Sequence, residues 1–485
     1  MDVILINSTS SIMKSLSKIR SLVSYEFPSM GLAYIAAILK ENKIKVRIID
    51  QFIDKITNCD ILNIIKNDSP KVVGFSCLTH NMGTVRKIVK EMKKSGLSPV
   101  IVLGNIHASI FADALLKEKI ADIVVHGEGE HVMLDILDAI VKMRPLHDIK
   151  GISFREGGEV YHNPRRAPIA DLDKLPYPSW ESINIKKYPR FLLLNGISLP
   201  LRTSRGCPYQ CYFCVQDAGF KTPRLRKIKN VVDEIEHLIN RFGVNKFVIL
   251  DSFFPFTKEY GFEFCDELIN RGLNNKIQWG IEARVDSLDF ALLKIMKEAG
   301  LSFILFGFEV GSQERLDEIN KETTLEQAKI IVSATKKLGI ISQGLFILGL
   351  PGETKKTCEQ TIKFAKELDC DLVKFNLAMP FPGSKFYEDY KDRIVDINQH
   401  SDNFDSWYNW SSYAGNPVYV PEGMTGRELI GLQRKAMLQF YARPKWVLRQ
   451  IIKKKIPPEY IFCGAYVLIS DFLKNITSDL QDLFN

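Results

Sequence analysis

The feature of this sequence that most constrains its fold is a repeated alternation between short apolar runs and longer amphipathic stretches. Over residues 1–145 the runs are rich in Val and Ile and lack polar alternation, which is typical of strands buried on both faces. The predicted strands are Val3–Ile6, Val46–Ile49, Val72–Ser76, Val100–Leu103 and Ile123–Val125. The predicted helices are Gly31–Glu41, Asp54–Lys66, Met82–Ser95, Ser109–Glu118 and Glu130–Lys142. Successive β-α units predict an α/β domain with a doubly wound parallel sheet, which binds ligands at the carboxyl ends of its strands.

The same alternation returns over residues 195–385. Six predicted strands are separated by helix-like segments, which indicates a partial (β/α)6 barrel of the TIM type. These strands are predicted at Ser198–Ser204, Phe247–Asp251, Ile277–Ala283, Phe303–Glu309, Ser342–Leu348 and Leu372–Ala378. The chemistry of such a barrel is expected at the carboxyl ends of the strands.

Two further segments lie outside these series. Residues 146–194 predict a β-hairpin that turns at Gly157 and Gly158, followed by a Pro-rich linker over the surface. Residues 386–485 are less regular and rich in aromatic side chains, including Trp407 and Trp410, and predict a mixed, mainly helical cap that forms the substrate region. The chain is therefore divided into four parts, at residues 1–145, 146–194, 195–385 and 386–485.

A basic stretch near the C-terminus allows two interpretations. Leu432–Arg449 has apolar residues at near-helical spacing with basic residues between them, and Pro444 is expected to interrupt the helix. The favoured interpretation is a helix packed on the barrel with a solvated basic face. The other is peripheral contact with an anionic membrane surface. The basic residues are Arg443, Lys445, Arg449, Lys453, Lys454 and Lys455.

Charge, hydropathy and cysteine content narrow the class of protein. The net charge of +8 is modest for 485 residues, so no nucleic-acid partner is expected. No apolar run reaches about 18 residues, the length of a membrane span, and the N-terminus does not have the pattern of a signal peptide. Nine cysteines, an odd number, fit reduced thiols better than a disulfide framework, so we expect a cytoplasmic protein.

Three of these cysteines fall close together, directly after the predicted strand Ser198–Ser204. Cys207, Cys211 and Cys214 have the spacing C-x3-C-x2-C, and no Cys or His follows closely behind them. Three thiolates can bind three irons of a cubane cluster and leave the fourth iron open to a small chelating ligand. A zinc ion completed by a distant fourth ligand is the alternative.

This segment resembles the radical S-adenosylmethionine (SAM) family, over roughly residues 195–385. Further motifs occur in the expected order, namely Asp251-Ser-Phe-Phe, Arg284-Val-Asp286, Gly307-Phe-Glu309-Val-Gly-Ser312 and Gly344 to Glu353. The resemblance implies that the three cysteines hold a [4Fe-4S] cluster, that SAM chelates its open iron, and that reduction cleaves SAM to a 5′-deoxyadenosyl radical. The SAM-binding residues that it implies are Phe213, Asp251, Arg284, Glu309, Ser312, Gly349 and Gly352.

The chemistry of these residues suits a charged nucleoside ligand. Glu309 can accept hydrogen bonds from an ammonium or a ribose, and the planar fork of Arg284 can grip a carboxylate. Gly349 and Gly352 allow the backbone to approach an adenine closely. For Glu309 or Arg284 taken alone, an ordinary ion pair is the competing interpretation.

The order of the domains resembles the cobalamin-binding subgroup of this family, in which a Rossmann-like cobalamin (B12) domain precedes the barrel. The implied cobalamin-binding residues are Pro28, Gly31, Ser76, Thr79, Gly104, His107, Gly127, Glu128 and Gly129. The D-x-H-x-x-G signature is absent, so we expect no histidine ligand on cobalt, and Thr79, His80 and Asn81 are the nearest candidates for its lower side. The alternatives are a nucleotide-binding domain or a scaffold that has lost its corrin. For His107, a structural loop histidine is the competing interpretation.

The resemblance implies an enzyme that transfers a methyl group from methylcobalamin to an unactivated carbon, with no catalytic side chain beyond the cluster ligands. Cyclisation, rearrangement or carbon–carbon bond formation on a lipid or natural product is the first alternative. A non-catalytic cobalamin or SAM sensor and an RNA methylthiotransferase are weaker ones, the latter because the first domain has only Cys59 and Cys77 for a second cluster. The expected partners are a small-molecule, lipid or natural-product substrate and an external one-electron reductant of the flavodoxin or ferredoxin type.

Overall fold

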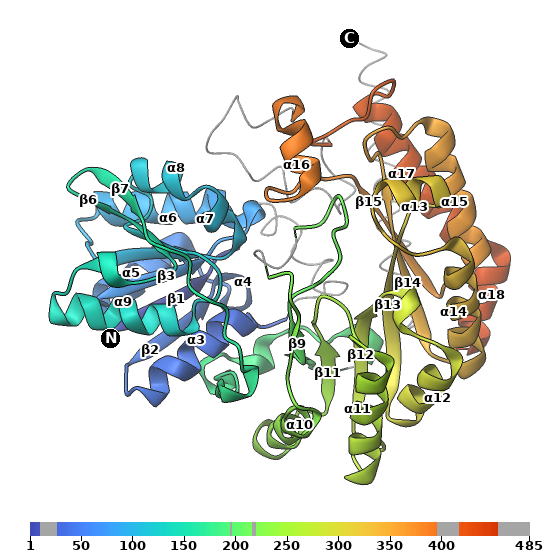
Figure 1. Cartoon of the computed structure of the whole chain (residues 1–485), viewed down its shortest axis with the longest axis horizontal. Coiled ribbons are helices and arrows are strands. Elements are labelled where there is room, and N and C mark those ends of the chain that lie inside the picture. Colours follow the sequence, from blue (N-terminus) through green and yellow to red (C-terminus); the bar gives the residue numbers. More distant parts are fainter. Residues whose placement is uncertain (10–26, 195, 216–219, 395–416, 454–485) are drawn as a thin grey trace.

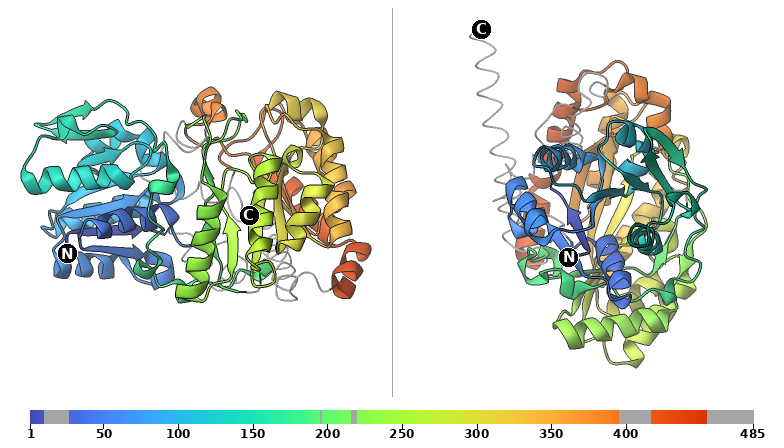
Figure 2. Two further views of the ribbon diagram at one scale, coloured as in Figure 1. Left: turned by 60° about the horizontal axis from the view of Figure 1, so that its bottom comes forward. Right: turned by 90° about the vertical axis from the view of Figure 1, so that its left-hand side faces the viewer.

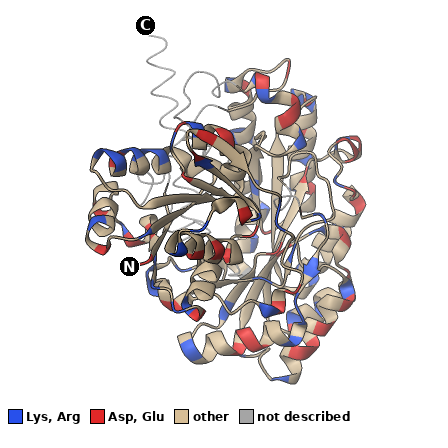
Figure 3. Cartoon of the chain, turned by 60° about the vertical axis from the view of Figure 1, so that its left-hand side comes forward, with Lys and Arg blue, Asp and Glu red and all other residues tan. Residues whose placement is uncertain are grey.

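The structure, a computed structural model, describes residues 1–9, 27–194, 196–215, 220–394 and 417–453. Two α/β lobes lie side by side, the first built on the N-terminal sheet and the second on the barrel strands (Figure 1). The same arrangement is seen from two further directions in Figure 2. Basic and acidic residues are interspersed on the face of the molecule that Figure 3 shows.

The first lobe contains the predicted doubly wound sheet. Its strand order is β2-β1-β3-β4-β5-β6-β7, and the first five strands of the chain are parallel. Their bounds are β1 Val3–Asn7, β2 Val46–Asp50, β3 Val72–Ser76, β4 Val100–Gly104 and β5 Ile123–Val125. The predicted hairpin is present as β6 Ile152–Glu156 and β7 Glu159–His162, and β6 pairs antiparallel with β5. The hairpin therefore extends this sheet.

Helices cover both faces of the first sheet, as buried parallel strands require. One apolar core lies between the sheet and α3 Met30–Glu41 and α9 Glu130–Lys142, and another lies under α5, α6 and α8. The remaining helices of this lobe are α4 Gln51–Asp54, α5 Asn58–Asp68, α6 Met82–Lys94, α7 Ile106–Ile110 and α8 Ala112–Lys117. The predicted helix Ser109–Glu118 is thus two helices. Phe111 lies between them and belongs to neither helix, and its ring packs against His107 and Tyr387.

The second lobe contains the predicted six-stranded partial barrel. All of its strands are parallel, in the order β15-β14-β13-β12-β11-β8. The strands are β8 Leu199–Leu201, β11 Lys246–Ile249, β12 Gln278–Ala283, β13 Leu301–Glu309, β14 Ile341–Leu348 and β15 Leu372–Leu377. The helices are α10 Ile228–Phe242, α11 Lys258–Asn270, α12 Phe290–Glu298, α13 Gln313–Glu318, α14 Leu325–Leu338 and α15 Lys355–Leu368. A separate two-stranded ribbon pairs β9 Ser204–Arg205 with β10 Arg224–Leu225.

The Pro-rich segment predicted as a linker contacts both lobes. It contains four short 3-10 helices, at Leu172–Lys174, Trp180–Ser182, Ile185–Lys187 and Leu192–Leu194. The Tyr188 hydroxyl donates to Asp50 Oδ2 in the first lobe at 2.8 Å, and the Trp180 side chain is buried in the barrel core. Burial of such large aromatic side chains stabilises the contact between linker and lobe.

The described part of the C-terminal region is helical and packs on the barrel. It comprises α16 Lys385–Tyr390, α17 Gly426–Tyr441 and α18 Pro444–Lys453. The helical stretch is therefore interrupted near Pro444 as predicted, with α17 ending at Tyr441 and Pro444 starting α18. In α17, Gln433 Nε2 donates to Phe375 O at 2.7 Å and Tyr441 Oη to Val373 O at 2.7 Å, both on β15. Within the described residues no helix is long and apolar enough to cross a membrane. Trp407, Trp410, Lys454 and Lys455 lie outside the described residues, as does most of the loop after β1.

Two of the basic C-terminal residues, Arg443 and Arg449, form ion pairs with the barrel instead of contributing to a solvated basic face. Arg443 Nη2 lies 2.9 Å from Asp369 Oδ1, and Arg449 Nη1 pairs with Asp369 Oδ2. Burial acts to raise the pKa of Asp369, but the hydrogen bond from Arg449 and the charge of Lys336 outweigh it, and the pKa is lowered. The carboxylate therefore stabilises the fold at neutral pH.

Replacing this carboxylate tests the contact. Asp369→Asn should lower the free energy of unfolding at pH 7 by about 1.5–3 kcal/mol, the range for hydrogen bonds to charged groups. Because the folded pKa lies below the unfolded value of about 3.9, the wild-type advantage is full above that pH and disappears as the pH falls through the folded pKa. Urea unfolding at several pH values measures it, with Asp138→Asn at an exposed ion pair as the control. An equal effect of Asp369→Asn at all pH values would contradict the charge argument.

Candidate functional site

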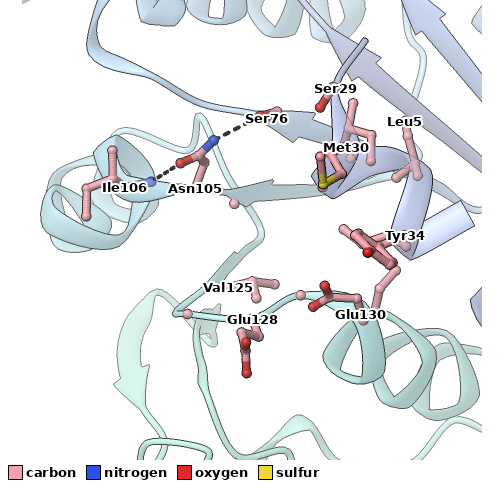
Figure 4. Close-up of a pocket in the computed structure, with 18 of the residues that line it drawn as sticks. Leu5, Ser29, Met30, Tyr34, Ser76, Asn105, Ile106, Val125, Glu128 and Glu130 are labelled. Carbon is pink, nitrogen blue, oxygen red and sulfur yellow. Dashed lines mark hydrogen bonds between the residues drawn. The ribbon is translucent and has the colours of Figure 1, made fainter. Parts of the chain in front are cut away.

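A cavity of about 440 Å³ opens at the carboxyl edge of the first sheet and faces the second lobe. Residues from the loops after β3, β4 and β5 and from α3 line one side, and Arg202, Arg205, Val215 and Phe220 of the second lobe line the other. The labelled side chains in Figure 4, among them Ser76, Asn105 and Tyr34, surround this space. Its position is the one expected for a ligand of a doubly wound sheet.

Most of the residues implied for cobalamin binding line this cavity. They are Gly31, Ser76, Gly104, Gly127, Glu128 and Gly129. A side-chain carbon built at Gly31 or Gly104 would meet no protein atom within 4 Å, so backbone is open to the cavity at both positions. A broad, flat cofactor such as a corrin can lie against such a surface, and the residues present fit that ligand.

Pro28, Thr79 and His107 are not among the residues that line the cavity. Thr79 and His107 are buried together, with 3.2 Å between Thr79 Oγ1 and His107 Nδ1. Burial lowers the pKa of His107 to about 3, so this imidazole is neutral at pH 7. Asn81 is also buried and donates to Ser8 O and Ser76 O, which holds the loop after β3 in place.

Asn105 is a cavity residue that the sequence analysis missed. Its φ of +76° is rare for a residue other than glycine, and its side chain accepts from Ile106 N at 2.7 Å and donates to Ser76 Oγ at 3.1 Å. The only sequence signal is its position between Gly104 and Ile106, after a predicted strand. Tyr34 of α3 was not named either, nor were Arg205 and Phe220, whose place in the wall depends on how the lobes meet.

The three predicted metal-ligating cysteines lie on the loop between β9 and β10. Cys207 N donates to Phe220 O at 3.3 Å, and Cys214 N donates to Cys211 O at 3.1 Å. Gly206 has φ +98°, and a side-chain carbon there would lie 2.9 Å from the carbonyl oxygens of Phe220 and Thr222. Only glycine fits this close approach, and it turns the chain directly before the first thiol.

The thiols converge without forming a site for one ion. The pKa of Cys214 is raised to about 12, first by desolvation in the surrounding protein and then by the nearby Cys211 and Cys207 thiols. In the part of the chain that the structure describes, no group of three His, Cys, Asp or Glu side chains could hold a single metal ion. A cluster suits these thiols, because each thiolate can bind a different iron and the positive charge reverses the rise in thiol pKa.

Three of the residues implied for SAM binding lie around this loop. Arg284 donates to both carboxylate oxygens of Asp286, at 3.0 and 2.9 Å, and its guanidinium lies 3.4 Å from the ring centre of Tyr209. Glu309 Oε1 accepts from Lys321 Nζ at 2.7 Å, and that ammonium lies 6.0 Å from the ring centre of Phe213. Arg284 and Glu309 therefore each form an ordinary ion pair within the protein here, as the competing interpretation of these two residues expected.

The other residues implied for SAM binding are Asp251, Ser312, Gly349 and Gly352. Asp251 is buried and accepts from Thr203 N at 2.9 Å and from Ser204 Oγ at 2.8 Å, so it anchors the strand that enters the cysteine loop. Ser312 precedes α13. Gly349 and Gly352 have φ of +87° and +76°, in a turn closed by Glu353.

Glu282 on β12 is a further residue, in the second lobe, that the sequence pattern did not single out. The apolar neighbours Trp279, Ile281 and Ala283 are buried in the outer core, so strand alternation puts Glu282 on the inner face of the barrel. Its side chain is exposed there, yet surrounding protein raises its pKa and the charge of Arg202 acts to lower it. A carboxylate at this position can accept a hydrogen bond from a molecule inside the barrel.

Comparison with known families and proteins gives several matches. The B12 binding domain matches residues 17–137, and the Radical SAM superfamily matches residues 201–365. The chain is similar to an uncharacterized methyltransferase of Pyrococcus horikoshii, with 32% identity over 440 residues that cover 90% of this chain and 93% of that protein. It is also similar to an anaerobic magnesium-protoporphyrin IX monomethyl ester cyclase of Rubrivivax gelatinosus, with 30% identity over 459 residues that cover 93% and 80%.

A solved structure has the same fold. TsrM from Kitasatospora setae, a radical S-adenosylmethionine methyltransferase with cobalamin and a [4Fe-4S] cluster bound, matches with a TM-score of 0.69. The match covers 92% of this chain and 90% of that chain at 17% identity. The predicted fold class, a doubly wound domain before a partial barrel, is therefore confirmed.

Loss of one thiol tests the candidate metal centre. Cys211→Ala should abolish retention of an iron–sulfur cluster after anaerobic reconstitution with iron and sulfide, because two remaining thiolates leave two irons without a protein ligand. Iron and sulfide content and the visible spectrum measure it. Cys59→Ala, at an exposed cysteine of α5, is the matched control and should retain the cluster. A full cluster in Cys211→Ala would contradict the assignment.

Proposed function

This chain belongs to the radical SAM proteins that carry a B12 binding domain, and from that premise we propose that it is an enzyme that methylates an unactivated carbon of a small organic substrate. The observation that carries the proposal is the shared boundary of the two candidate sites. Phe220 lines the cavity of the first lobe, and its carbonyl accepts the hydrogen bond from Cys207 N. A group held in the cavity and a group held on the thiols would therefore face the same space.

Each cofactor has a set of residues that suits it. Cys207, Cys211 and Cys214 would hold a [4Fe-4S] cluster, and the open glycine backbone at Gly31 and Gly104 would support cobalamin. SAM would lie at the carboxyl ends of the barrel strands, where the candidate residues Phe213, Asp251, Arg284, Glu309, Ser312, Gly349 and Gly352 are proposed to act by contact or by positioning. When bound, these cofactors supply reductive cleavage of SAM and a methyl group carried on cobalt.

In that scheme, the side chains of this protein bind the cofactors and orient the cysteine loop. The paired Arg284 and Asp286 hold Tyr209 of the cysteine loop by stacking, and Lys321 neutralises Glu309 beside the same loop. The walls of the cavity are mostly apolar, from Leu5, Met30, Val125 and similar residues, so a cofactor bound there would displace water from them. No side chain is required as a nucleophile.

Radical cyclisation or rearrangement is the second candidate. The magnesium-protoporphyrin cyclase of Rubrivivax gelatinosus is 30% identical to this chain over most of both lengths, which favours keeping this alternative. The candidate cofactor residues serve either reaction, since both need an open iron and a corrin site.

The proposed partners are a small-molecule, lipid or natural-product substrate and a one-electron reductant of the flavodoxin or ferredoxin type. Specificity would come from the inner face of the barrel, where Glu282 is available to the substrate. The ion pairs of Arg443 and Arg449 with Asp369 leave fewer free charges for peripheral membrane contact.

Isotope transfer tests the proposed reaction. The reconstituted chain is incubated anaerobically with hydroxocobalamin, a reductant, a small-molecule extract and SAM that carries a CD3 group. We expect a product in which CD3 replaces one hydrogen of an extract component, together with deoxyadenosine and S-adenosylhomocysteine, measured by mass spectrometry.

The controls separate the candidate functions. Cys211→Ala should form neither the labelled product nor deoxyadenosine, whereas Cys59→Ala should form both. Deoxyadenosine with a new unlabelled product would favour cyclisation or rearrangement. Labelled product from Cys211→Ala would overturn the proposal.

A further inference from the structure

We propose that four buried charges, Arg205, Arg224, Glu128 and Glu130, couple occupancy of the cobalamin cavity to the geometry of the cysteine loop. The inference rests on the proposed function, because it concerns the cofactors assigned there. The four side chains, hereafter the interlobe charge cluster, are positioning residues that act through the backbone on either side of them.

The two arginines lie opposite each other on the ribbon that closes the cysteine loop. In the antiparallel pairing of β9 with β10, Arg205 is the direct partner of Arg224. Like charges in that position destabilise a pair of strands. The ribbon has only one other residue pair, Ser204 with Leu225, so it has little other stabilisation of its own.

The first lobe supplies the opposite charges. Glu128 Oε1 accepts from Arg205 Nη1 at 2.8 Å and from Arg224 Nη1 at 2.9 Å, and Glu130 Oε1 accepts from Arg205 Nη2 at 2.6 Å. Glu128 Oε2 also accepts from Ile169 N at 2.6 Å. Both oxygens of Glu128 are thus engaged by protein groups, although the residue lines the cavity.

The interlobe charge cluster is shielded from water. Its side chains are between 5% and 12% exposed. Burial acts to lower the pKa of Arg205, but the charges of Glu130 and Glu128 outweigh it and raise the pKa. Ion pairs buried to this extent are weakly screened by salt, and removing one partner leaves an uncompensated charge.

Both ends of the cluster connect directly to a cofactor site. Arg205 is followed by Gly206 and Cys207, while Gly127, Glu128, Gly129 and Glu130 all line the cavity. A side-chain carbon at Gly127 would lie 3.2 Å from the Phe220 ring, and Arg224 lies 4.9 Å from the centre of that ring. A ligand that shifts the loop after β5 must therefore shift the ribbon that shapes the cysteine loop.

Coupling is measured as a difference in affinity. Hydroxocobalamin is titrated into the full chain in its cluster-loaded form and after removal of the cluster by chelation. For the wild type we expect dissociation constants that differ at least about five-fold between the two forms, the lower end of typical coupling between sites. We also expect hydroxocobalamin to change the EPR spectrum of the reduced cluster.

Glu128→Gln keeps the shape of the side chain and removes its charge. It should reduce the difference between the two affinities to less than about two-fold, a coupling free energy close to zero, and should abolish the EPR change. Asp54→Asn removes a carboxylate that pairs with Lys187 of the linker away from the cavity, and should keep the wild-type coupling. If Glu128→Gln does not fold, as judged by circular dichroism, Arg224→Gln takes its place in the same measurements.

The outcomes separate this inference from the proposed function. Equal affinities in the two wild-type forms would overturn the coupling and leave the function standing. A Glu128→Gln variant that binds more weakly but keeps the full difference would also overturn it, because Glu128 would then be only a wall of the cavity. Absence of hydroxocobalamin binding to the wild type would overturn both.

Discussion

The close approach of Gly206 to the carbonyl groups of Phe220 and Thr222 is the constraint on which the candidate site depends. It brings the start and the end of the cysteine loop together, and the hydrogen bond from Cys207 N to Phe220 O fixes the first thiol at that point. Because Phe220 also forms part of the cavity wall, the same contact sets how near the two candidate cofactor sites lie. A short ribbon with a glycine at its corner thus links the two candidate cofactor sites.

Two buried carboxylates, one from each lobe, hold the ends of that loop. Asp251 of the barrel accepts from Thr203 and Ser204 at the entrance, and Glu128 of the first lobe accepts from Arg224 at the exit. Burial raises the pKa of Asp251, and the charge of Arg202 and the hydrogen bonds from Thr203 and Ser204 oppose that rise. Each carboxylate loses hydration on folding, so its hydrogen bonds must be well made to compensate. Such a loop has a defined geometry only when both lobes are in contact with it.

The sequence predicted the features that depend on local pattern. Runs rich in Val and Ile predicted the parallel strands of the first sheet, and the returning β-α alternation predicted those of the barrel. Pro444 predicted a helix boundary, and the cysteine spacing singled out the candidate metal-ligating loop. Features that depend on contacts distant in sequence were missed or left open. Phe111, where the predicted helix Ser109–Glu118 divides, packs against Tyr387 far along the chain. The pairing of Arg284 with Asp286 is local, but it was left open because the motif that holds both residues was attributed to the cofactor. The periodicity of the sequence shows which face of a helix or strand a residue occupies, but it does not identify the residue that its side chain contacts.

Strained backbone marks both candidate sites independently of these motifs. Most residues other than glycine with positive φ end helices, as Lys55, Ser69, Met143 and Asp369 do, where the left-handed conformation is common. Asn105 and Glu309 instead follow or end strands at the carboxyl edges of the two sheets, with φ of +76° and +65°. Such conformations persist only when surrounding contacts fix them, here Ser76 for Asn105 and Lys321 for Glu309. Each sheet thus carries one such residue at the carboxyl edge of its strands, which is where ligands bind in both kinds of fold. The strained residues therefore support, independently of the motifs, a ligand site at each of the two edges.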